Sequence, residues 1–315
     1  MTQPIGSEPH TEGLDTHTKK KPPKNLLDGM VKALRPKQWV KNVLVLAAPA
    51  AAGSSALLNP TTLIDVAIAF AVFCMAASSI YLVNDARDVE ADREHPTKRF
   101  RPIAAGVLPV PMAYCMAVAL IVGALGVSWL ATSGRDLCVV VGIYIALQLG
   151  YCFGWKHQPV IDIALVSSGF MLRAMAGGVA AGIMLSQWFL LVAAFGSLFM
   201  ASGKRYAEIL LAERSGAKIR KSLEGYTAPY LRFVWTLSAT AVVMSYALWG
   251  FDMHGGVWYQ VSMVPFTVAI LRYAADIDRG DGGAPDELAL SDRTLQALAL
   301  LWVVCIVLAV YVNPA

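Results

Sequence analysis

The stretch TTLIDVAIAFAVFCMAASSIYLVN, residues 61–84, runs directly into the acidic sequence DARDVEADR, residues 85–93. The first part is long and apolar enough to cross a hydrocarbon core of about 30 Å as a helix. A backbone in lipid must satisfy its own hydrogen bonds, and a helix does this within one segment. The stretch therefore predicts a transmembrane helix that ends in a dense group of carboxylates at a membrane surface.

The composition extends this prediction to the whole chain of 315 residues, of which 57% are hydrophobic and 15% are charged. A soluble domain carries about 25% charged residues, so much of this surface is expected to face lipid. The five cysteines have no metal-site spacing, which indicates small buried side chains. We predict an all-α integral membrane protein with nine transmembrane helices, at residues 39–58, 61–84, 109–132, 136–153, 160–182, 186–203, 229–251, 256–275 and 294–313.

Basic residues set the predicted orientation of these spans. They cluster before the first span, after the second and after the sixth, whereas the loops on the other side contain only Arg135. Because basic loops stay in the cytoplasm, we expect a cytoplasmic N-terminus, an external C-terminus and a location in the inner (plasma) membrane. Residues 1–30 are expected to form a disordered basic cytoplasmic tail, and residues 31–315 the transmembrane domain.

The carboxylates after the second span have helical spacing. Asn84, Asp88 and Asp92 follow one another at intervals of four residues, so on a helix they share one face, and Asp85 flanks it. Like charges at this spacing repel, so the row favours a bound cation, and ligands that are all oxygen suit Mg²⁺. The alternative is a solvated acidic turn, but solvated faces usually mix charges of both signs. We predict that Asn84, Asp88 and Asp92 bind Mg²⁺.

Basic and aromatic residues at the same ends of the spans are candidates for binding phosphate groups, because cations neutralise oxygens that a metal leaves uncovered. Simple positive-inside topology is the alternative for Lys98, an ion pair with Asp162 is the alternative for Lys156, and a pair with Glu208 is the alternative for Lys204. The predicted substrate-binding residues are Lys37, Lys41, Arg87, Lys98, Arg101, Tyr151, Lys156, Arg173, Lys204 and Arg205.

Arg173 differs from the other cations because it lies about midway along the span 160–182. A charged side chain at that depth is costly and is normally paired or faces a cavity. Its sequence neighbourhood offers no obvious carboxylate partner. We therefore predict that Arg173 faces an anionic ligand.

The pattern Asn84-Asp85-x-x-Asp88-x-x-x-Asp92, with Arg101-Pro102 downstream, resembles the first aspartate motif of the UbiA-type intramembrane prenyltransferase superfamily. The resemblance implies nine helices around a central cavity that opens to the cytoplasm, with magnesium and a diphosphate at its mouth. Members of that superfamily carry a second aspartate motif after the sixth helix. This chain has residues 204–208, KRYAE, at that position, with one carboxylate and two cations.

Several segments resemble one branch more closely, the decaprenyl-phosphate phosphoribosyltransferases. The resemblance implies magnesium-dependent transfer of a 5-phosphoribosyl group from phosphoribosyl diphosphate to decaprenyl (polyprenyl) phosphate, with release of diphosphate, for synthesis of a cell-wall arabinan precursor. It implies catalytic roles for Asp85, Asp88 and Asp92, no nucleic-acid partner, and leaves a homo-oligomer open. The segments are residues 34–49, 84–106, 169–178, 203–208 and 272–292.

Three other functions are alternatives to this expectation. A prenyltransferase acting on an aromatic acceptor predicts a second carboxylate pair after the sixth span, which the sequence lacks. A transporter or channel predicts helices interrupted at mid-membrane and polar residues towards both faces, whereas polar residues here gather at one face. A lipid-binding scaffold without catalysis leaves the acidic row unexplained.

Overall fold

The computed structural model describes residues 22–53, 56, 58–215, 223, 225–252, 257–279 and 291–312. Every regular element within these ranges is a helix, as the sequence predicts. Most of the expected tail, residues 1–21, and most of the acidic segment after residue 279 lie outside the described residues. The first helix, α1 (Leu26–Ala33), begins inside the segment 1–30 that was predicted to be disordered.

Each expected span coincides with helical structure, but the first is not one α-helix. It consists of a 3₁₀ helix, η1 (Pro36–Leu46), followed by the short α2 (Ala47–Ala51). The other elements are α4 (Pro60–Arg87), α5 (Val89–Glu94), η2 (Lys98–Phe100), α6 (Val110–Leu130), α7 (Gly134–Cys152), η3 (Trp155–His157), α8 (Ile161–Ala180), α9 (Gln187–Ser215), α10 (Ala228–Asp252), α11 (Val257–Arg279) and α13 (Arg293–Val312).

Five of the helices in the described residues are long and apolar enough to cross a membrane, namely α4, α6, α7, α8 and α10. The longest of these, α4, begins with Pro60 after Asn59, whose side chain accepts a hydrogen bond from the Thr61 N–H. Its 28 residues extend over about 42 Å, more than the hydrocarbon core of about 30 Å. An end of α4 therefore projects beyond the lipid, and the count of nine spans remains a prediction.

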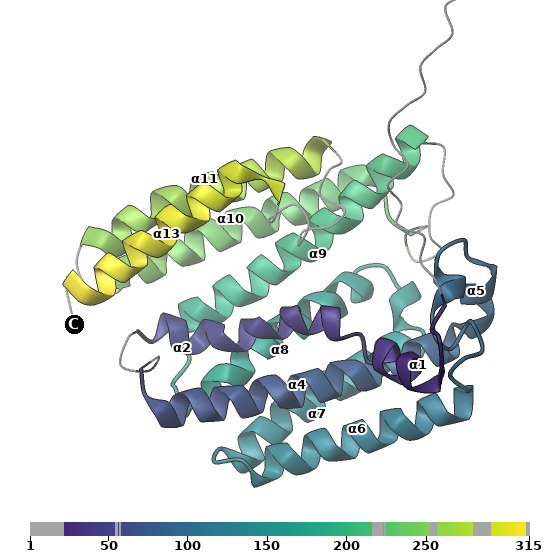
Figure 1. Cartoon of the computed structure of the whole chain (residues 1–315). Coiled ribbons are helices and arrows are strands. Elements are labelled where there is room, and N and C mark those ends of the chain that lie inside the picture. The colour runs from purple at the N-terminus through teal and green to yellow at the C-terminus, as the bar shows by residue number, and fades with distance from the viewer. Residues whose placement is uncertain are drawn as a thin grey trace, which may run out of the picture.

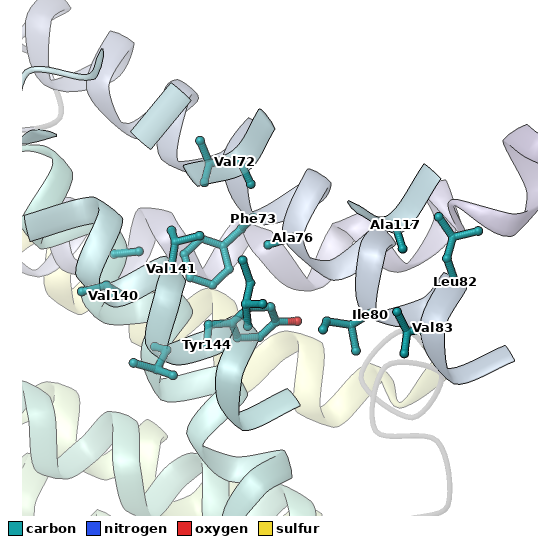
Figure 2. Packing of buried hydrophobic residues seen from close by; sticks show 14 of the residues in the cluster. Val72, Phe73, Ala76, Ile80, Leu82, Val83, Ala117, Val140, Val141 and Tyr144 are labelled. Atoms are coloured by element: carbon teal, nitrogen blue, oxygen red, sulfur yellow. The ribbon is translucent and has the colours of Figure 1, made fainter. Parts of the chain in front are cut away.

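The helices form two groups (Figure 1). In the first, α4 packs on α6, α7 and α8, and in the second, α9 packs on α10 and α11 packs on α13. Contacts between α8 and α9 join the groups. Figure 2 shows the core of the first group, where Phe73 of α4 lies beside Val141 and Tyr144 of α7. The rings of Phe73 and Tyr144 are 5.1 Å apart, and this core joins α4 to α7 and to the second half of α8.

The contact between η1 and α8 is a close backbone approach. A Cβ added at Gly177 of α8 would lie 1.7 Å from the carbonyl oxygen of Val45 in η1. Only glycine fits at this crossing, so η1 lies directly against α8. This contact brings the residues of η1 to the same side of α4 as those of α8.

Candidate functional site

The acidic row lies at a break between two helices. On one continuous helix Asn84, Asp88 and Asp92 would share a face, but α4 ends at Arg87 and α5 begins at Val89. Asp88 stands between them with φ −89° and ψ 12°, and its N–H still donates to the carbonyl of Asn84. Asp85 therefore lies on α4, Asp88 lies between the two helices and Asp92 lies on α5, so the three carboxylates do not share one face of a single helix.

Asp85 is 3% exposed and accepts hydrogen bonds from two guanidinium groups. Nη2 of Arg35 lies 2.6 Å from each carboxylate oxygen, and Nη1 of Arg101 lies 3.1 Å from Oδ1. The guanidinium of Arg35 also stacks over the ring of Tyr81 at 4.8 Å. Charge-assisted hydrogen bonds of this kind fix the carboxylate firmly, and they leave Asp85 little freedom to bind anything else.

Asp92 and Asp88 have cationic partners of their own. Arg101 donates to Oδ2 of Asp92 at 2.6 Å, so it bridges Asp85 and Asp92, and Lys98 lies 4.0 Å from Asp92 Oδ1. Nζ of Lys156, on η3, donates to both oxygens of Asp88 at 2.9 and 2.8 Å. The structure thus brings the predicted Lys98, Arg101 and Lys156 directly to the acidic row.

The donor set suits magnesium in its chemistry. Asn84, Asp88 and Asp92 offer only oxygen ligands, which Mg²⁺ prefers. Their present positions correspond to a cation-paired arrangement, because Lys156 and Arg101 hold oxygens that a metal would need. Across the described residues, no group of three or more His, Cys, Asp or Glu side chains is already arranged around a common metal position. Binding of a metal here requires the lysine and arginine to give up these oxygens.

Arg173 is 7% exposed and is held by neutral groups. Its Nε donates to Asn42 Oδ1 at 2.7 Å, its Nη1 to the carbonyl of Gly169 at 2.6 Å, and its Nη2 to the Tyr144 hydroxyl at 3.0 Å. The ring of Phe73 lies 5.8 Å from the guanidinium carbon. Its hydrogen-bond partners in the described part of the chain include no carboxylate. Arg173 therefore links η1, α7 and α8.

Arg205 lies in an ion pair between two helices. Its guanidinium donates to both oxygens of Asp162 at 3.1 and 3.2 Å and to Glu208 at 3.3 Å. Burial by itself lowers the pKa of the Arg205 guanidinium, but Asp162 and Glu208 outweigh that effect and raise the pKa above its ordinary value. Asp162 thus pairs with Arg205 rather than with Lys156, and Glu208 pairs with Arg205. Lys204 is half-buried, and the neighbouring carboxylates of Asp162 and Glu208 pair with Arg205, so Lys204 forms no ion pair with another described residue.

The remaining predicted residues lie at the margin of this region. Lys37 is exposed on η1, Lys41 is half-buried, and Arg87 is exposed with its guanidinium 4.5 Å from the centre of the Phe153 ring. Tyr151 is half-buried near the end of α7, close to the Arg205–Asp162 ion pair. The structure does not place Lys37 or Arg87 in contact with the acidic row.

Sequence reasoning missed Arg35 as a site residue. It has a left-handed backbone conformation, with φ 54°, between α1 and η1, and this directs its side chain onto Asp85. Ser78 fixes the junction, because its hydroxyl donates to the carbonyl of Leu34 and accepts a hydrogen bond from the Trp39 indole N–H. No signal in the sequence indicated this conformation, because proline biases the residue before it towards extended backbone, whereas Arg35 is left-handed.

The chain is similar in sequence to proteins of one membrane-enzyme family. The sequence model of the UbiA prenyltransferase family matches residues 42–295. The chain is 78% identical over 315 residues to a decaprenyl-phosphate phosphoribosyltransferase of Corynebacterium glutamicum, an alignment that covers 98% of this chain and 95% of the relative. It is 62% identical over 303 residues to the protein of the same name from Mycolicibacterium smegmatis, covering 92% and 95% of the two chains.

Solved structures of low sequence identity share the fold. A UbiA homolog from Archaeoglobus fulgidus bound to DMAPP and Mg²⁺ superposes with a TM-score of 0.68 at 14% identity, over 90% of this chain and 99% of that chain. A digeranylgeranylglyceryl phosphate synthase gives a TM-score of 0.64 at 15% identity, over 91% and 98% of the two chains. The likeness covers both groups of helices.

Proposed function

The chain belongs to the UbiA prenyltransferase family, and on that premise we propose that it transfers a 5-phosphoribosyl group from phosphoribosyl diphosphate to decaprenyl phosphate. It is a multi-pass membrane protein and a transferase of the decaprenyl-phosphate phosphoribosyltransferase branch. The single observation that carries this assignment is the 78% identity to the corynebacterial enzyme along nearly the whole of both chains.

The family is named for transfer of a prenyl group, whereas the proposed reaction transfers a phosphoribosyl group. In the proposed reaction the prenyl lipid is the acceptor, and a phosphorylated sugar takes the place of the prenyl diphosphate donor. The segment after the expected sixth span fits this difference, because Arg205 and Lys204 stand where related enzymes carry a second aspartate motif. Of these two cations, Lys204 is the one without an ion-pair partner among the described residues, and we assign it to a donor phosphate.

We assign Asn84, Asp88 and Asp92 to a magnesium ion that, when bound, stabilises the negative charge of the departing diphosphate. The archaeal homologue bound to Mg²⁺ supports a divalent metal in this fold. Asp85 is then a positioning residue, because its two oxygens orient the guanidinium groups of Arg35 and Arg101. The remaining N–H donors of both arginines are available to phosphate oxygens.

The residues of the site provide charge neutralisation and positioning. Lys98, Arg101 and Lys156 hold phosphate oxygens of the donor as positive charge develops at C1 of the ribose. The lipid phosphate attacks C1 from the face opposite the leaving diphosphate, so the new C–O bond forms as the old one breaks. A phosphate ester is already ionised at neutral pH, so this nucleophile needs no strong general base. Arg173, which lies on α8 and hydrogen-bonds Asn42 of η1, is assigned to the acceptor phosphate.

The proposed topology follows the same premise. Nine spans surround a cavity that opens to the cytoplasm of the cell, the N-terminus and the acidic row are cytoplasmic, and the C-terminus lies outside. The break between α4 and α5 supports this, because it places charged groups at the end of a helix longer than the lipid core. Transfer would therefore take place at the inner face of the plasma membrane.

A transfer assay tests the proposal. Purified full-length protein in lipid nanodiscs receives labelled phosphoribosyl diphosphate, decaprenyl phosphate and Mg²⁺, with a parallel sample that contains EDTA. We expect a labelled lipid product that disappears with EDTA and returns when excess Mg²⁺ is added. Transfer from a prenyl diphosphate to an aromatic acceptor, with no product from the phosphoribosyl donor, would contradict the proposal.

A further inference from the structure

The short helix α1 has three distinct faces at intervals of four residues. Gly29 and Ala33 are buried against the protein. Leu27 and Val31 are apolar yet 72% and 57% exposed. The third face carries Asp28 and Lys32, which form an ion pair at 2.7 Å. A helix with an exposed apolar face beside an exposed charged face is typical of a helix that lies along a membrane surface.

The position of α1 in the fold agrees with this pattern. Figure 1 shows α1 at the same end of α4 as α5, which is the end that carries the acidic row. α4 is longer than the lipid core, and the charged groups of the acidic row gather at this end, so we expect this end to lie where the hydrocarbon gives way to headgroups. An apolar face that is not covered by the protein can be covered there by acyl chains, while the charged face remains in water.

The buried face of α1 rests on the loop that carries Arg101. A Cβ added at Gly29 would lie 3.0 Å from Cγ1 of Val107 and 3.8 Å from Cβ of Pro102. Pro102 directly follows Arg101, whose guanidinium bridges Asp85 and Asp92. Any shift of α1 towards the loop would therefore displace a residue next to this arginine.

The other end of α1 leads directly to Arg35. Ala33 is buried in the core, and the carbonyl of Leu34 accepts a hydrogen bond from the Ser78 hydroxyl at 2.8 Å. Arg35 follows in its left-handed conformation and reaches Asp85. The two arginines that hold Asp85 thus both depend on the position of this one short helix.

We propose that α1 is a membrane-surface helix whose exposed Leu27 and Val31 insert among the acyl chains at the headgroup boundary, and that this insertion holds Arg35 and Arg101 on Asp85. The partner is the lipid bilayer surface on the side of the acidic row. The first half of the proposal concerns only the location of the helix. The second half rests on the proposed transfer of phosphoribose, because its readout is the affinity for that donor.

Fluorescence quenching tests the location without any use of the reaction. A dye is attached to Leu27→Cys, to Val31→Cys or, as the control on the charged face, to Lys32→Cys, in a background with Cys115→Ser and Cys138→Ser. The other three cysteines are buried. In nanodiscs we expect lipids with a doxyl group to quench dyes at 27 and 31 at least about threefold more than the dye at 32, and aqueous iodide to show the reverse order.

Two results of this experiment would overturn the location. Equal quenching by iodide at positions 27 and 32 would place the whole helix in water. Protection of position 27 from both quenchers would mean that protein covers this face, as in a contact with a second copy of the chain. Either result stands whether or not the protein transfers phosphoribose.

Kinetics test the coupling to the site. We expect Leu27→Glu with Val31→Glu to raise KM for phosphoribosyl diphosphate about tenfold, because Arg35 and Arg101 lose their alignment. The matched control, Leu27→Phe with Val31→Leu, keeps the apolar face and should keep the KM of the wild type. An unchanged KM in the double glutamate variant, with quenching that shows its helix in water, would overturn the coupling. Absence of transfer by the wild type would instead contradict the proposed function.

Discussion

At the α4–α5 break, three carboxylates are held by cations, and two of these cations come from distant parts of the chain. Arg35 precedes the first expected span, and Lys156 follows the fourth, yet both contact acids at the end of the second. Each of these carboxylates lies within hydrogen-bond distance of at least one cationic side chain. The pairing also makes each side chain sensitive to the loss of a single partner, so substitutions at this site should have large and separable effects.

Neutral isosteres of the proposed metal ligands test their role. We expect Asp88→Asn and Asp92→Asn each to lower the rate of magnesium-dependent transfer by about 100-fold or more, because an amide oxygen carries no charge to hold the metal. The rates are measured across a Mg²⁺ titration, and the apparent affinity for Mg²⁺ should fall in parallel. As a control, Glu90→Gln alters an exposed acid that pairs with Arg93 and should change the rate little. Full turnover in both asparagine variants would refute the metal assignment.

Arg35 offers a prediction that sequence reasoning alone did not make. We expect Arg35→Ala to lower kcat/KM for phosphoribosyl diphosphate by about 10- to 100-fold, because Asp85 loses the donor that contacts both its oxygens. Arg35→Lys should recover part of this loss, since lysine keeps the charge but not the planar stacking on Tyr81. Arg135→Ala, an exposed arginine far along the chain, is the matched control. Equal activity of Arg35→Ala and wild type would exclude a positioning role.

Among the contacts between helices, the crossing of η1 and α8 leaves the least room for a side chain larger than that of glycine. A methyl group at Gly177 cannot coexist with the Val45 carbonyl 1.7 Å away, so the two segments must separate. We expect Gly177→Ala to lower the free energy of unfolding by at least about 2 kcal/mol, which thermal unfolding in detergent can measure. Gly142→Ala on α7 is the matched control, because nothing lies within 4 Å of its added Cβ.

The control should be neutral or stabilising by up to about 1 kcal/mol, because alanine favours a helix more than glycine does. Equal melting temperatures for the two alanine variants would show that the crossing can relax. A lower melting temperature for both variants would show that α7 and α8 do not tolerate substitution in general.

The sequence contained enough information to locate the helices but not their interruptions. Apolar length predicts where a chain can cross lipid, and helical structure is present at every expected span. The 3₁₀ winding of η1 and the break at Asp88 depend on tertiary packing, such as the contact with Gly177, which periodicity does not record. For the same reason, the row of acids was recognisable, whereas the left-handed conformation of Arg35 was not.

At the scale of the whole molecule, the ion pair between Asp162 and Arg205 connects the two groups of helices. Asp162 begins the last helix of the first group, and Arg205 lies on the first helix of the second. The sequence offered the nearer Lys156 as a partner for Asp162, because proximity along the chain is the only distance that a sequence shows. In three dimensions Asp162 is 0% exposed and turns towards α9.

Removing the charge of Arg205 alone should therefore lower the free energy of unfolding more than removing the charges of both Arg205 and Asp162. We expect Arg205→Leu to lower the free energy of unfolding by about 3 to 5 kcal/mol, because it leaves a buried carboxylate without a cation. The double variant Asp162→Asn with Arg205→Gln should recover most of this loss. Thermal unfolding measures stability, and KM for phosphoribosyl diphosphate is measured on the double variant. A normal KM would show that Arg205 serves the fold, and a raised KM would show that it also binds the donor.

The pairing of every carboxylate in the acidic row with a cation gives the site an alternating pattern of charge. A ligand that is only anionic meets carboxylates between the cations, and one that is only cationic meets guanidinium and ammonium groups between the acids. A diphosphate that carries its own divalent ion presents both signs together and exchanges partners with both kinds of side chain at once. Metal and donor should therefore bind with positive cooperativity, each raising the affinity of the site for the other. Inhibitors for such a surface would need charges of both signs.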